Sequence, residues 1–184
     1  LAGLEKSALT RGHVICHPKV TLTTTRFDAA VEIRPGAGRE IENHERVRVH
    51  VGTAEVIGKV LILDGREVLP PRSSAYCQIV LEEPVIALRG DRFILRNQTA
   101  QGTLGGGEVI HPFAQRHRRA ETDVCERLAV LRAADLGAAC RTYLELQSAF
   151  ASPLDEIYQG VNARDDEVAT VLARFDVARA LLTA

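Results

Sequence analysis

Two glycine-containing stretches have spacings that could hold phosphate. Gly52 and Gly58 precede Lys59, but five residues separate the two glycines, and Val60 stands where a phosphate loop needs Ser or Thr. The stretch also follows a strand pattern, so we expect a strand with a glycine at a bulge and no nucleotide site. For the glycine run 105–107 we favour a bulge or tight barrel corner over a cradle for a partner.

Histidines and carboxylates do not form a catalytic or metal-binding pattern. His13 and His17 flank an extended stretch, whereas a zinc site needs three or four converging ligands. Glu82 and Glu83 are neighbours in a strand pattern, so they point to opposite faces and cannot flank one bond. We find no nucleophile-and-base pattern, and we expect neither catalysis nor a cofactor or metal in this chain.

Three features could contact nucleic acid. Arg46, Arg48 and His50 alternate along one strand and would form a basic stripe. A compact basic run, which is either a solvated linker or a phosphate contact, consists of Arg116, His117, Arg118 and Arg119. The third feature is a predicted helix-turn-helix, a weak indication because that fold also serves as a packing unit.

Composition limits the class of protein. The chain has 184 residues and a formal net charge of −1, which argues against a basic coat but allows a local basic patch. Aromatic residues make up 4% and Trp is absent, so stacking platforms for single-stranded bases are not expected. No apolar run reaches the roughly 20 residues of a membrane helix. The four cysteines form no CxxC pair, which favours a reducing, cytoplasmic location.

The first part of the chain has the alternation of β-strands. Apolar and polar residues alternate over 27–33, 47–51 and 75–81, with Pro and Gly turn signals between them. Strands at this spacing, without helices between them, predict an antiparallel barrel or sandwich of six to seven strands between Phe27 and Ile110.

After Pro112 the periodicity becomes helical. Val124, Leu128 and Leu131 share one helical stripe, and Asp135 is a plausible N-cap of a second helix. Further on, we expect an N-cap at Ser152, a short helix over 154–159 ended by Gly160, and another helix capped by Asp165. Together these predict a helix-turn-helix, and 177–182 could be a first wing strand.

Several motifs point to one family. The sequence reads Leu-Glu-Glu-Pro-Val at 81–85, Arg-Gly-Asp-Arg-Phe at 89–93 and Thr-Leu-Gly-Gly-Gly at 103–107. With 9–15 and 44–56, these stretches resemble the third domain of Tu-type translation elongation factors, and most closely the selenocysteine-specific elongation factors of bacteria. Gly102 stands where that family often has Arg.

The resemblance implies a domain organisation. Residues 1–17 would be the tail of a second β-barrel, and 18–112 the third-domain β-barrel. Residues 113–120 would be a basic linker, and 121–184 a helical, incomplete winged-helix domain. The nucleotide-binding domain, with its GTP and Mg²⁺, would lie outside this chain, which should not hydrolyse GTP.

The resemblance also implies a function. The full protein would be a translational GTPase that brings selenocysteinyl-tRNA to the ribosome at recoded UGA codons, while winged helices beyond this chain hold a messenger RNA hairpin. The barrel would face the acceptor and T stem of the tRNA. The residues predicted to bind RNA are His44, Arg46, Arg48, Thr53, Gln101, Thr103, Gly105, Arg116, Arg118 and Arg119. The alternatives are a non-catalytic docking module, or an enzyme that uses the glycine loop.

Overall fold

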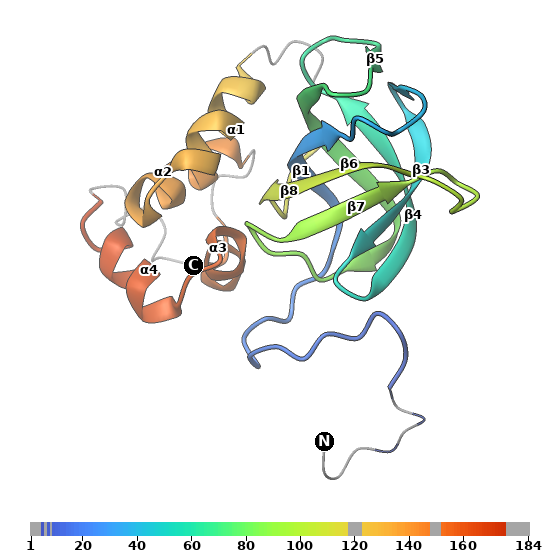
Figure 1. Cartoon of the computed structure of the whole chain (residues 1–184). Coiled ribbons are helices and arrows are strands. Elements are labelled where there is room, and N and C mark those ends of the chain that lie inside the picture. Colours follow the sequence, from blue (N-terminus) through green and yellow to red (C-terminus); the bar gives the residue numbers. More distant parts are fainter. Residues whose placement is uncertain (1–4, 6, 8, 118–122, 148–151, 176–184) are drawn as a thin grey trace.

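The computed structural model describes residues 5, 7, 9–117, 123–147 and 152–175, and within them a closed antiparallel barrel precedes four helices (Figure 1). Around the barrel the strand order is β1-β6-β4-β3-β7-β8. These strands are β1 (Thr24–Ile33), β3 (Glu45–Val51), β4 (Ala54–Ile62), β6 (Ser74–Val85), β7 (Arg92–Arg96) and β8 (Thr103–His111). A small separate sheet pairs β2 (Ile41–Glu42) with β5 (Val68–Leu69). The predicted antiparallel barrel is confirmed, with six strands in the ring.

The barrel interior is filled by the apolar residues of the alternating strands. Val49, Ile79 and Leu95 are fully buried, and the rings of Phe27 and Phe93 meet edge to face with their centroids 5.4 Å apart. Because successive residues of a strand point to opposite faces, this filling sends the polar residues outward. The core therefore determines which side chains the outer surface presents.

The glycine run 105–107 lies where β8 is pressed between β1 and β7. A Cβ atom on Gly107 would overlap the carbonyl oxygen of Ala30, and one on Gly106 that of Phe93. Pairing with β7 skips Leu104, which is an extra residue of β8 next to the run. The prediction of a bulge and close strand approach, rather than a cradle, is confirmed.

The other glycine pair behaves differently. Gly52 and Thr53 form the turn between β3 and β4, where Gly52 has φ +56°. Gly58 lies inside β4, and its pairing with β3 and β6 is regular, so the predicted bulge is wrong. Glycine is needed there because a Cβ atom would lie 2.9 Å from the carbonyl oxygen of Val80.

Four helices follow the barrel. They are α1 (Val124–Ala133), α2 (Leu136–Leu146), α3 (Leu154–Val161) and α4 (Asp165–Leu172). Asp135 caps α2 as predicted, because its side chain accepts the Ala138 N–H at 2.9 Å. The predicted wing strand over 177–182 lies outside the described residues.

The ends of α3 and α4 differ from the prediction. Pro153 rather than Ser152 is the N-cap of α3, and Arg164 rather than Asp165 is the N-cap of α4. Gly160 does not end α3, which continues to Val161 and stops at the left-handed Asn162. The reason is tertiary packing: a Cβ atom on Gly160 would overlap the ring of Tyr143.

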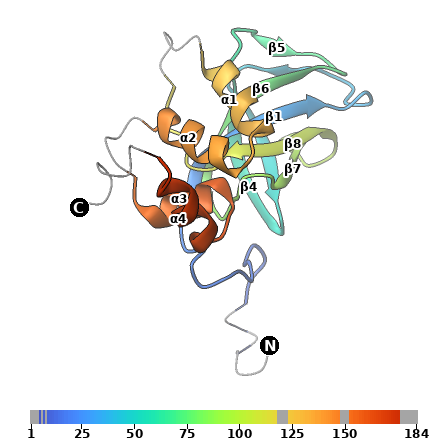
Figure 2. The same cartoon turned by 90° about the vertical axis from the view of Figure 1, so that its left-hand side faces the viewer.

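The helices pack on one side of the barrel, as both Figure 1 and the view turned by 90° in Figure 2 show. Ile110 of β8 belongs to the helical core, and Ala30 and Tyr76 pack against it from the barrel. The guanidinium of Arg89 donates hydrogen bonds to the carbonyls of Leu131 (2.7 Å) and Ala134 (3.1 Å), which end α1. The barrel and the helices therefore form one packed unit. No helix among the described residues is long and apolar enough to cross a membrane.

A buried histidine lies at this junction. His111 is 1% exposed, and its ring stacks on that of Tyr143 at a centroid distance of 4.7 Å. Burial lowers the pKa of His111 to about 4, although the nearby Asp28 carboxylate opposes the shift. The imidazole is therefore neutral at physiological pH, and protonating it would place a charge in the interface.

We predict that Gly107→Ala destabilises the barrel by about 1–3 kcal/mol, because the added methyl group must displace the backbone of β1. Chemical denaturation measures this change. Gly102→Ala is the matched control: its Cβ would meet only the Asn97 side chain, at 3.8 Å, and it should leave stability nearly unchanged. Equal effects of the two substitutions would contradict the assigned close approach.

We also predict a stability difference with pH that depends on His111. On acidification the unfolded chain takes up the proton near pH 6.5, and the folded chain only near pH 4. The free energy of unfolding of the wild type should therefore fall by about 3 kcal/mol between pH 7 and pH 4 because of this group. His111→Phe keeps the ring stacking, and its free energy of unfolding should fall by about 3 kcal/mol less than that of the wild type over the same pH range. Urea denaturation at the two pH values measures it, and parallel losses in the two proteins would refute it.

Candidate nucleic-acid interface

The outer face of β4, β3 and β7 carries two pairs of like charges. Val47, Val49 and Val51 of β3 point inward, so Arg46 and Arg48 point outward. In the strand register Arg46 lies directly opposite Lys59 of β4, and Arg48 directly opposite Arg96 of β7. Like charges at directly opposed positions destabilise a sheet. This face therefore has a local excess of positive charge that its own packing does not require.

The face is only partly neutralised. Arg46 forms an ion pair with Glu82, and Arg48 one with Glu55 at 2.7 Å. Within the described part of the chain, Lys59 has no ion pair, and the Nε atom of Arg96 has no hydrogen-bond partner. Among the described residues, two of these four cations, Arg46 and Arg48, thus have a carboxylate partner, and Lys59 and Arg96 have none.

Glu55 also joins this face to the segment that precedes the barrel. Its carboxylate contacts Arg48 and, at 3.1 Å, Arg11. The hydrogen bond from Arg48 is the main cause that lowers the pKa of Glu55, and the charges of His50 and Arg11 add to it. Glu55 is therefore ionised at neutral pH and weakens the positive potential around Arg48.

The β7–β8 loop extends the cationic face. The Nε of Arg48 donates to the carbonyl oxygen of Gln98 at 2.7 Å and holds the loop over β3. Asn97 accepts the Gly102 N–H at 3.0 Å and braces the loop from within. Gln101 is exposed in this loop, and Thr103 is paired with Arg96 at its base. We call Arg46, Arg48, Lys59, Arg96, Gln101 and Thr103 the cationic face.

The structure places several predicted residues differently from the expectation. Thr103 and Gly105 lie in β8 rather than in the loop before it, and Gly105 is paired in register with both neighbouring strands. The exposed His44 stands in the turn before β3, at φ +66°. Thr53 lies in the turn after β3. At about 3.4 Å per residue of extended strand, it is roughly 30 Å from His44. His44 and Thr53 are therefore at opposite ends of the barrel.

The described part of the predicted basic run, Arg116 and His117, is also remote from the cationic face. Arg116 is exposed, and Nε2 of His117 lies 2.7 Å from the fully buried Asp28 carboxylate of β1. Strand β1 lies across the six-stranded ring from β3, so Arg116 does not join Arg48. Arg118 and Arg119 lie outside the described residues.

Sequence reasoning missed two residues of the cationic face, Lys59 and Arg96. Each occupies an outward position of an alternating strand, so alternation alone could have marked both as exposed. Their position beside Arg46 and Arg48 depends on strand register, which alternation does not give. In the described part of the chain, no group of three or more His, Cys, Asp or Glu could hold a metal ion.

Comparisons with known proteins identify the class to which this closed antiparallel barrel with its helical extension belongs. Residues 28–116 match the family model described as the selenocysteine-specific elongation factor, beta-barrel domain. The selenocysteine-specific elongation factor of Desulfomicrobium baculatum is 32% identical over 134 residues, which are 73% of this chain and 21% of that protein. The chain belongs to the selenocysteine-specific elongation factor family. It spans about a fifth (21%) of that relative's length.

We predict that Glu55→Gln strengthens binding of the chain to a polyanion. The substitution removes the carboxylate that Arg48 and Arg11 share, and it keeps the size of the side chain. The variant should elute from a heparin column at higher salt than the wild type. Asp166→Asn, which removes an exposed carboxylate of α4, is the control. A shift no larger than that of the control would show that Glu55 does not limit the potential of the cationic face.

Proposed function

We propose that the barrel binds selenocysteinyl-tRNA, through the backbone of its acceptor and T stem, for delivery to the ribosome at recoded UGA codons. The observation that carries this proposal is the two pairs of opposed like charges, Arg46 with Lys59 and Arg48 with Arg96. Phosphate groups placed between such cations would relieve their repulsion and release counterions. Membership of the selenocysteine-specific elongation factor family supports the choice of ligand.

The kinds of side chain on the cationic face suit folded RNA. Arginine offers a planar set of donors that matches phosphate. Gln101 and Thr103 add an amide and a hydroxyl, groups that can pair with a ribose 2′-hydroxyl. Such contacts would read the shape of an RNA helix rather than its base sequence.

The position of the helices is compatible with this ligand. They pack against Ala30, Tyr76 and Ile110, on the side formed by β1, β6 and β8. The β7–β8 loop points away from them in Figure 1. The cationic face is therefore left uncovered, which a tRNA-binding surface requires.

The rest of the proposal concerns the whole protein. GTP and Mg²⁺ would bind to a nucleotide-binding domain outside these residues, so this chain by itself would not hydrolyse GTP. A messenger RNA hairpin would be held by winged helices beyond α4. The protein would act in the cytoplasm, together with the ribosome.

We predict that Arg48→Ala and Arg96→Ala each weaken tRNA binding about tenfold, because each removes a charged hydrogen bond to phosphate. Each should also reduce the slope of log K against log salt by about one. Filter binding of a selenocysteine tRNA across a KCl series measures both quantities. Arg174→Ala, an exposed arginine that follows α4, should change neither. Unchanged affinity and slope in both face variants would instead favour a docking module without RNA contact.

A further inference from the structure

The segment that leads into the barrel is held by the helices. Residues 9–23, which we call the strap, precede β1. The side-chain amide of Gln159 in α3 contacts Leu22 of the strap at both ends: its oxygen accepts the Leu22 N–H at 3.0 Å, and its nitrogen donates to the Leu22 carbonyl at 2.6 Å. Gln159 is only 4% exposed. One buried amide thus satisfies both backbone groups of a strap residue, as a neighbouring strand would.

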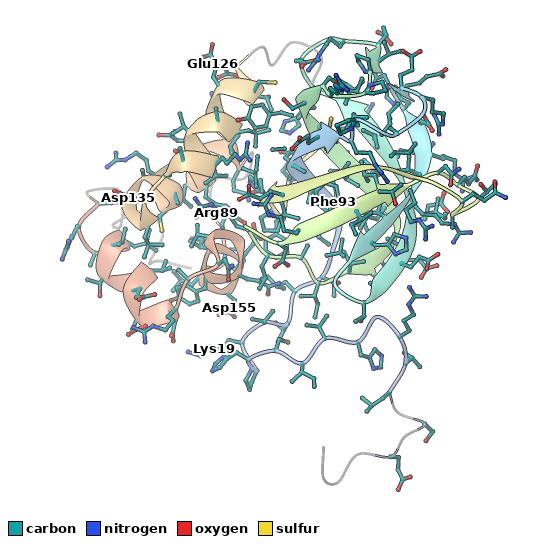
Figure 3. The ribbon with its side chains drawn as sticks, viewed as in Figure 1. Lys19, Arg89, Phe93, Glu126, Asp135 and Asp155 are labelled. Atoms are coloured by element: carbon teal, nitrogen blue, oxygen red, sulfur yellow. The ribbon has the colours of Figure 1, made fainter. Side chains whose placement is uncertain are left out.

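A second contact joins the strap to α4. Lys19 forms an ion pair with Asp165, the first residue of that helix. The hydrogen bond between the two groups raises the pKa of Lys19 and lowers that of Asp165. Figure 3 shows Lys19 beside the helices, close to Asp155 of α3. Both groups of the pair are exposed, so we expect it to contribute less than the buried amide contact.

The same two helices are anchored to the barrel. The side chain of Asn162, in the turn between α3 and α4, donates to the carbonyl oxygen of Arg89 at 2.8 Å. Arg89 in turn caps the end of α1. Figure 3 places Arg89 between the helices and the barrel. The turn between the two helices that contact the strap is therefore fixed relative to the barrel core.

The helix pair is poorly suited to hold nucleic acid in the usual way. In a helix-turn-helix the first turn of the second helix meets the nucleic acid. Here that turn carries Asp165, Asp166 and Glu167, whose charges would repel phosphate. Gln159 and Asp165 contact the strap instead, while Asp166 and Glu167 form ion pairs with Arg164.

We propose that α3 and α4 are a clamp on this chain's own strap, which sets the direction in which the polypeptide enters the barrel. The clamp has a buried part, Gln159 on Leu22, and an exposed part, Asp165 on Lys19. It ties residues before the barrel to helices after it. Any event that shifts α3 must therefore also release or move the strap, whether or not the barrel binds RNA.

Hydrogen exchange of the Leu22 amide in the whole chain tests the clamp, because that amide has Gln159 as its acceptor. In Gln159→Leu we expect exchange at Leu22 to rise at least tenfold, while Ala29 and Val31 in the barrel keep their protection. Lys19→Ala, on the exposed strap, should give a smaller rise at Leu22 without disturbing the helices.

Asp166→Asn is the matched control, because it removes the neighbouring carboxylate of α4 that has no contact with the strap. It should leave exchange at Leu22 unchanged. Unaltered protection of Leu22 in Gln159→Leu would overturn the clamp. So would an equal rise at Leu22 and at Ala29, since this would mean loss of the fold rather than release of the strap.

Discussion

The close approach of β8 to its two neighbours is the constraint on which the other features depend. Side chains at Gly106 and Gly107 would overlap carbonyl oxygens of β7 and β1, so only glycines allow the ring to close there. Closure fixes the register of β7 against β8, and β7 is also paired with β3. That pairing places Arg96 opposite Arg48. A run of residues without side chains thus determines where the charged side chains of the neighbouring strands stand.

The cationic face is an arrangement that costs stability. A sheet selected for stability alone would alternate charges across its strands, whereas here Arg46 opposes Lys59 and Arg48 opposes Arg96. The apolar core on the inner side of the same strands keeps the register in spite of this repulsion. Because the cations are fixed by β-structure, little further ordering of the backbone is needed when an anion arrives.

Sequence patterns predicted the parts of the molecule that depend on local periodicity. The alternation from Phe27 onward and the cap at Asp135 were sufficient for the barrel class and the start of α2. The features that sequence patterns predicted wrongly or missed depend on tertiary contacts. Gly160 would normally end a helix, yet it remains inside α3 because the Tyr143 ring occupies the space of its missing side chain. Likewise, Arg96 becomes part of the cationic face only through register, which local pattern does not contain.

The distribution of polar contacts separates the two halves by role. On the helical side, two polar side chains bind backbone groups of other segments: Gln159 holds Leu22, and Arg89 holds the end of α1. On the opposite side of the ring, Arg48 is paired with Glu55, while within the described residues Lys59 and Arg96 form no ion pair. An anionic ligand gains most where cations lack internal partners. Under the proposed function, binding would therefore belong to the barrel, while the helices keep its other side, and the chain that enters it, in a fixed position.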